Sequence, residues 1–203
     1  MNQLSQLIEQ KEWMRISKQY TPKDLAENLS FVNGLILSRL LLENESFDDT
    51  IQIFAIELIK AIKELYKNEW ESDWRYEAYL GYAYEFPGWY YEEQYDAYKR
   101  AFVKSGESDP EVLMRVAINW NCPGVYKQKL DEKQAIELLE KALIKKPYIE
   151  RISCLVNLYN DVGDMPQKKH WQAILEESEK KQLHAPYAFL DVFDTYGWKG
   201  PNG

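Results

Sequence analysis

The spacing of apolar residues predicts helices along most of this chain. Apolar side chains recur with helical spacing from Leu4 to Met14, which predicts a first amphipathic helix, and again from Leu25 to Leu40. The second run follows Thr21-Pro22-Lys23-Asp24, where a hydroxyl cap, a proline and an acid are typical of a helix start. No alternating run of useful length predicts a strand. We therefore expect an all-α protein in which one helical rhythm continues from Thr21 to Leu40.

Short turns separate the later helices. After a helix that starts at Ser46 and continues to Leu65, the breakers are Phe86-Pro87-Gly88, Ser105-Gly106, Asn121-Cys122-Pro123-Gly124, Lys146-Pro147 and Val162-Gly163-Asp164. Connections this short place neighbouring helices antiparallel. The pattern thus predicts antiparallel helix pairs, one of them over residues 110–147.

An internal repeat is present in the second half of the chain. Its best instance is the stretch 131–147, in which Ala135, Leu139 and Ala142 share one helix face and a proline follows the helix. The stretch 113–120 precedes it as a partner helix. Leu80, Val116 and Leu155 hold equivalent positions, 36 and 39 residues apart. Repeats of this length are typical of stacked helical units.

This repeat resembles the tetratricopeptide repeat, and a related Sel1-like repeat is an alternative, over about residues 73–185. The resemblance implies antiparallel helix pairs stacked as a short α-solenoid. We expect an N-terminal helical cap or small bundle at 1–70, the repeats at 71–195 and an extended tail at 196–203, folding as one cooperative domain. The resemblance also implies a concave groove, which by register carries Glu111, Met114, Asn121, Asn157 and Asp161.

Charge and composition limit which partners, cofactors and reactions the sequence supports. The chain has 25 basic and 33 acidic residues, for a net charge of −8, which argues against nucleic acid as the partner because phosphate binding needs clustered cations. Two histidines and two cysteines are too scattered for a metal site, and no phosphate-binding or nucleophile motif is present. We expect no cofactor, no metal and no catalytic residue.

The chain is also expected to stay in the cytoplasm. Its first residues lack the charged start and apolar core of a signal peptide. The most apolar window, residues 29–42, is shorter than the roughly 20 apolar residues that cross a bilayer, so no membrane contact is predicted.

The most unusual segment of the sequence is residues 70–98. It holds twelve aromatic residues and seven acidic ones against a single base, Arg75. One helix face accounts for only about half of a helix, so all of these rings cannot be buried together. Exposed Tyr and Trp dominate protein-binding hot spots, and interleaved carboxylates suit Lys and Arg. Packing of the rings against the N-terminal helices is the alternative, and both interpretations can hold for different rings.

These observations favour a non-enzymatic protein-binding module for a basic protein partner. Such a small, acidic, single-domain protein is similar by type to bacterial immunity proteins that neutralise a basic toxin. A peptide-binding adaptor or assembly factor is the first alternative, and an unrecognised hydrolase is the second. The expected protein-binding residues are Trp74, Tyr82, Glu85, Trp89, Tyr90, Glu92, Glu93, Asp96, Asn121, Asn157 and Asp161.

Overall fold

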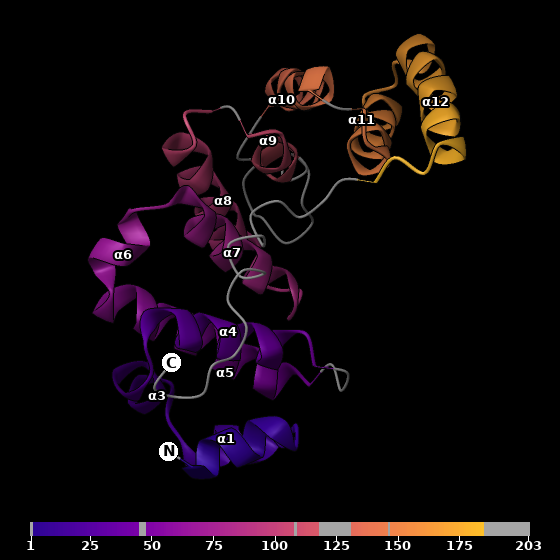
Figure 1. The fold of residues 1–203 in the computed structure, drawn as a ribbon. Coiled ribbons are helices and arrows are strands. Elements are labelled where there is room, and N and C mark those ends of the chain that lie inside the picture. The colour runs from indigo at the N-terminus through magenta and orange to yellow at the C-terminus, as the bar shows by residue number, and fades with distance from the viewer. Residues whose placement is uncertain (1, 45–47, 108, 118–130, 146, 185–203) are drawn as a thin grey trace. The chain divides into compact units, whose positions relative to one another are not determined.

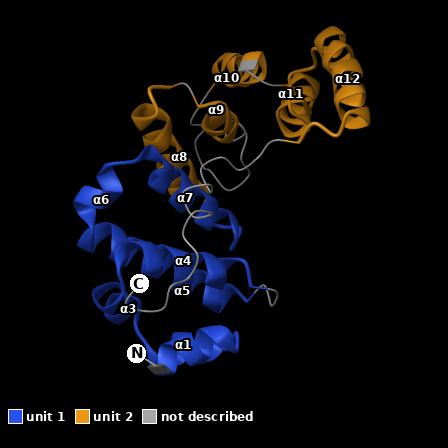
Figure 2. Ribbon diagram, viewed as in Figure 1, with its two compact units in different colours: residues 1–90, 189–203 blue, residues 91–188 orange. Residues whose placement is uncertain are grey.

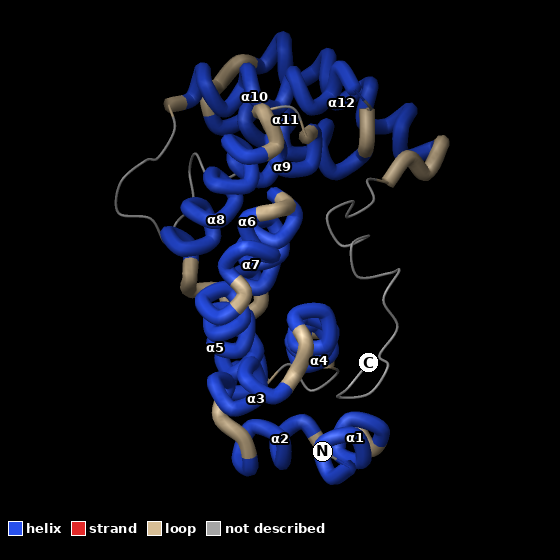
Figure 3. Tube along the Cα trace, turned by 60° about the vertical axis from the view of Figure 1, so that its left-hand side comes forward, coloured by secondary structure: helices blue, strands red, loops and turns tan. Residues whose placement is uncertain are grey.

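The computed structural model describes residues 2–44, 48–107, 109–117, 131–145 and 147–184. Within these ranges all regular structure is α-helical, in twelve helices without a strand (Figures 1 and 3). Neighbouring helices pack in pairs, which confirms the predicted all-α class. The chain forms two compact units (Figure 2): unit 1 contains the described residues up to Tyr90, and unit 2 those from Tyr91 onward.

Helix α5 is the centre of unit 1. It packs against α2, α3, α4, α6 and α7. Its N-terminus is fixed by Asp48, whose carboxylate accepts a hydrogen bond from the Thr50 N–H at 2.8 Å. Ile56 and Leu58 are two positions apart, hence on nearly opposite sides of the helix, and both are fully buried, so more than one face of the helix is covered. The helices of unit 1 are α1 (Asn2–Glu9), α2 (Trp13–Gln19), α3 (Pro22–Asn28), α4 (Phe31–Leu42), α5 (Asp49–Leu65), α6 (Lys67–Glu71) and α7 (Trp74–Glu85).

A single glycine permits the close approach of α4 to α5. A Cβ atom placed on Gly34 would lie 2.6 Å from Ile62 Cδ1, well inside van der Waals contact. A glycine in a helix interior costs about 1 kcal/mol relative to alanine, so packing rather than helix propensity explains its presence.

Two helices expected to be continuous are interrupted in the structure. The first, expected from Leu4 to Met14, is divided into α1 and α2, because Lys11 between them has a left-handed φ of +54°. The second is the rhythm expected from Thr21 to Leu40. Helix α3 ends at Asn28 and α4 begins at Phe31. The Ser30 hydroxyl accepts a hydrogen bond from the Asn33 N–H at 3.3 Å and so starts a new helix. Leu25 and Leu35 are both buried, and therefore the apolar spacing alone did not reveal the break. The start signal at Thr21 is confirmed, because Thr21 and Asp24 form a reciprocal capping box.

Unit 2 is a series of helices in which each packs against the next. Its core gathers apolar side chains from four of them, with Met114, Leu139, Leu155 and Leu175 as representatives. Figure 1 shows the last two helices side by side as a pair. The helices are α8 (Tyr91–Lys104), α9 (Pro110–Ala117), α10 (Glu132–Lys145), α11 (Ile149–Asp161) and α12 (Met165–Lys180).

The helix pair predicted over residues 110–147 is present as α9 and α10. These helices pack against each other, and Ala117, Ala135 and Ala142 are all fully buried, as the repeat pattern predicts. Asp131 accepts from the Gln134 N–H while the Gln134 amide oxygen accepts from the Asp131 N–H, so α10 has a reciprocal cap. The domain ranges 1–70, 71–195 and 196–203 remain predictions, and the two compact units divide at Tyr90 and Tyr91.

We expect Ala135→Leu to lower the free energy of unfolding by about 1–3 kcal/mol, because a larger side chain has no room at this contact. Ala135 is 0% exposed among Leu139, Leu155 and neighbouring core residues. Urea unfolding followed by circular dichroism measures the change. Lys141→Leu, at an exposed position of the same helix, is the control, and equal stability of the two variants would contradict the packing.

Candidate functional site

The rings of residues 70–98 are divided between core and surface. Fully or almost fully buried are Trp70, Tyr79, Tyr84, Tyr95 and Tyr98. Half-buried are Trp74, Tyr76, Tyr82, Phe86, Tyr90 and Tyr91. Trp89 alone among these twelve is fully in the exposed class, with 50% of its surface accessible. The sequence left open whether the rings form core or surface, and the structure assigns some to each.

A buried carboxylate anchors the first part of this segment. Glu77 on α7 is 1% exposed and accepts hydrogen bonds from Lys63 Nζ at 2.7 Å and from the indole N–H of Trp70 at 2.9 Å. The Lys63 ammonium also lies 5.4 Å from the centre of the Trp70 ring. A buried charge is tolerated only when it is paired in this way, so these three side chains connect α5, α6 and α7.

Other rings of α7 pack on the N-terminal helices. The Tyr79 hydroxyl is hydrogen-bonded to the Ser38 hydroxyl of α4 at 2.9 Å, and burial raises the pKa of Tyr79. Tyr76 meets Phe31 edge to face with ring centres 5.0 Å apart. For these rings the packing interpretation is confirmed. Tyr82 is half-buried, with its hydroxyl donating to Glu43 at 3.4 Å.

A second group of rings surrounds a cation of the chain itself. Lys60 Nζ on α5 lies 5.7 Å from the Tyr84 ring centre and 5.9 Å from that of Tyr90, and Tyr90 packs on Trp89 at 6.1 Å. The same ammonium donates a hydrogen bond to Glu57 at 2.8 Å. We call Tyr84, Trp89 and Tyr90 the ring cluster.

The electrostatics of Lys60 favour the charged form. Burial opposes the charge, but the hydrogen bond to Glu57 and the nearby phenol groups outweigh it and raise the pKa of Lys60. In unit 1 the charged Lys60 ammonium thus lies beside the faces of two rings of the cluster, Tyr84 and Tyr90. The sequence did not predict this role for Lys60, because about thirty residues separate it from the rings and only the packing of α5 reveals it.

Three predicted acids lie on the exposed side of α8. Glu92, Glu93 and Asp96 are all exposed at its N-terminal half. Carboxylates in a first helical turn also stabilise the helix itself, because they face the positive end of its dipole. The presence of Glu92 and Glu93, which lie in the first turn, thus has a structural reason, and the exposure of all three acids leaves them accessible to a cationic partner.

The residues predicted to line the groove are divided between surface and core. Asn157 and Asp161 are exposed on α11, and Asn121 lies outside the described residues. Glu111 and Met114, expected by register to face the groove, are instead buried. Met114 belongs to the core that α9 shares with α10, α11 and α12, which is why it is not accessible.

Glu111 is buried and paired with two arginines. It accepts a hydrogen bond from Arg115 Nε at 3.1 Å and lies 3.7 Å from Arg151 of α11. Burial raises the pKa of Glu111 although both arginines oppose the shift. The i, i+4 spacing of Glu111 and Arg115 is visible in the sequence, whereas the approach of Arg151 requires the fold.

The histidines and the described cysteine have ordinary surroundings. His170 is exposed beside Trp171, and His184 Nδ1 lies 2.8 Å from Glu150 Oε1 at an exposed position after α12. Burial raises the pKa of the Cys154 thiol to about 11. Across the described ranges no three His, Cys, Asp or Glu side chains gather in a way that could hold a metal ion. In the same part of the chain no helix has the length and apolar character needed to cross a bilayer.

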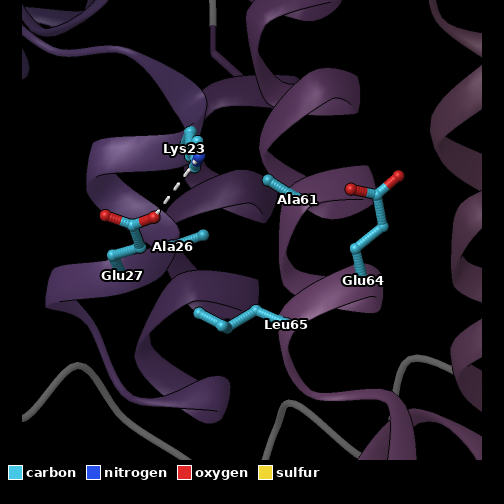
Figure 4. Close-up of a pocket in the computed structure, with 6 residues that line it drawn as sticks. All are labelled: Lys23, Ala26, Glu27, Ala61, Glu64 and Leu65. Atoms are coloured by element: carbon cyan, nitrogen blue, oxygen red, sulfur yellow. Dashed lines mark ion pairs between the residues drawn. The ribbon is translucent and has the colours of Figure 1, made fainter.

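A pocket of about 360 Å³ lies between α3 and α5 (Figure 4). Ala26, Ala61 and the half-exposed Leu65 give it an apolar base, and Lys23 forms an ion pair with Glu27 at 3.8 Å on one side. In Figure 4 the carboxylate of Glu64 turns away from these side chains. The lining offers apolar contact and one solvated ion pair.

Comparisons with known proteins found no relative of this chain. No protein-family model matches the chain, and no curated protein or solved structure is significantly similar to it.

We expect Glu77→Ala to lower the free energy of unfolding by about 3 kcal/mol, because Lys63 and the Trp70 indole would lose their buried acceptor. Chemical unfolding at neutral pH measures this loss. Glu69→Ala, at an exposed position of α6, should change stability by less than about 0.5 kcal/mol. If both variants were equally stable, Glu77 would not anchor the segment.

We expect Cys154 to react slowly with alkylating reagents. With Cys122 replaced by alanine, the remaining thiol has a pKa of about 11, so at pH 8 its alkylation should be about a hundredfold slower than that of a free thiol of pKa near 8.5. The rate should still be rising at pH 10, as measured by mass spectrometry on the folded protein. A plateau near pH 9 would contradict the burial of this thiol.

Proposed function

We propose that this protein is a non-enzymatic binding module for a basic protein. The observation that carries the proposal is the half-exposed Trp89, which belongs to a ring cluster that already holds a lysine ammonium. Large exposed aromatic side chains are characteristic of binding hot spots. Cation binding by the neighbouring rings indicates which charge the partner brings.

Charge supports the same conclusion. Net charge −8 gives the whole chain a field that attracts cations, and Glu92, Glu93 and Asp96 place exposed carboxylates on α8. In this proposal the carboxylates speed the encounter, while rings and a few desolvated pairs hold the complex.

The narrower form of the proposal is a bacterial immunity protein that masks a basic toxin. Its support is the combination of small size, acidic charge and the exposed Trp89 ring. A peptide-binding adaptor of tetratricopeptide type is the second candidate, favoured by the exposed Asn157 and Asp161 on α11. The burial of Glu111 and Met114 removes two positions that such a groove would use, so we rank it second.

The test is affinity capture from the native host with three baits, followed by quantitative mass spectrometry. The baits are the unmodified protein, Trp89→Ala, and the control Ile144→Ala, which truncates an exposed apolar side chain of α10. The proposal expects a basic protein that is captured by the first and third baits and depleted with the second. Equal capture by all three baits, or capture of an acidic protein, would refute it.

We expect the association rate with this partner to fall as salt rises, because exposed charges are screened over about 8 Å at physiological ionic strength. Glu92→Lys with Glu93→Lys should slow association about tenfold at low salt and leave dissociation nearly unchanged. Surface plasmon resonance separates the two rates. Glu176→Lys with Glu179→Lys makes the same charge change on α12 and serves as the control. An association rate independent of salt would contradict electrostatic steering.

A further inference from the structure

Lys60 occupies the position that a ligand of the ring cluster would take. Its ammonium lies over the faces of Tyr84 and Tyr90, at 5.7 and 5.9 Å from their centres, and is hydrogen-bonded to Glu57. Aromatic faces joined with a carboxylate are the usual surroundings of a bound alkylammonium group. The internal occupant thus shows which ligand chemistry the cluster accepts.

The hold on Lys60 is weak. Both ring distances are close to the roughly 6 Å beyond which cation–π attraction is small. The side chains of Lys60 and Glu57 are 38% and 48% exposed, so solvent reaches their ion pair and weakens it. A flexible lysine on the helix surface can swing into water without disturbing α5. The occupant can therefore be exchanged.

We propose that Glu57 and the ring cluster form a receptor for a lysine side chain of a protein partner, and that Lys60 fills this receptor in the free protein. The inference rests on the proposed function and names the group that the partner inserts. Glu57 would then receive the incoming ammonium, Tyr84 and Tyr90 would supply their faces, and the half-exposed Trp89 would cover the aliphatic part of the side chain.

Occupation by Lys60 has a consequence for affinity. An incoming lysine must displace Lys60 and overcome its positive charge, so removal of that charge should strengthen binding more than removal of a distant one. Lys67 is the matched control, since it is an exposed lysine of unit 1 on α6.

The test uses short peptides and needs no identified partner. N-acetyl-Gly-Lys-Gly-amide is titrated into the full chain, and the Trp89 indole resonance is followed by NMR. Lys60→Gln should bind this peptide about threefold more tightly than the unmodified protein, a change on the scale of one cation–π contact, while Lys67→Gln should bind it almost as the unmodified protein does. The same peptide with norleucine in place of lysine should not bind.

Second variants keep the result interpretable. The double variant Lys60→Gln with Tyr90→Leu should lose the increased affinity for the lysine peptide. The double variant Lys60→Gln with Tyr90→Phe should keep it, because phenylalanine retains the ring face. Equal gains for Lys60→Gln and Lys67→Gln, or a gain that survives Tyr90→Leu, would overturn the receptor. Capture of a basic protein by the intact chain would then still stand, so the two proposals can fail separately.

Discussion

Burial of the Glu77 carboxylate is the constraint on which the ring-rich part of unit 1 depends. A charge removed from water is stable only with partners, and Lys63 and the Trp70 indole supply them. The three side chains come from three different helices, so satisfying one carboxylate fixes α5, α6 and α7 together. Once α7 is fixed, Tyr79 reaches Ser38 in the core and Tyr84 is brought over to Lys60. The same constraint thus determines which rings are buried in the core and which lie beside Lys60 at the surface.

This arrangement explains why so many aromatic residues occur in one segment. Tyr and Trp combine large apolar area with a polar tip, so they can be buried only where that tip finds a partner. Trp70 and Tyr79 find partners at Glu77 and Ser38 and become core. Trp89 follows Gly88, whose φ of +75° is the left-handed conformation that glycine adopts readily, and its ring remains half in water. The proposed binding activity centres on Trp89, the ring of this segment that is left most exposed.

The sequence was sufficient for the all-helical class and for some helix contacts, but not for the break between α3 and α4. The small residues Ala135 and Ala142 correctly predicted the packing face of α10, and Thr21 correctly predicted the start of α3. Both predictions were possible because caps and helix periodicity are local properties of the sequence. The division of the rings was not predictable, since it depends on Ser38 and Lys63, which are distant in the chain. The role of Lys60 was missed for the same reason. Register carried over from a repeat also placed Glu111 in a groove, whereas contacts with Arg115 and Arg151 keep it buried.

Hydroxyl-radical footprinting tests the division of the rings most directly, because mass spectrometry gives an oxidation rate for each aromatic residue. In the free protein Trp89 should be oxidised much faster than Trp70 and Tyr79, in accordance with their burial. Addition of the captured basic partner should protect Trp89 and leave the two buried rings unchanged. Similar rates for Trp70 and Trp89 in the free protein, or no protection of Trp89 in the complex, would contradict the account.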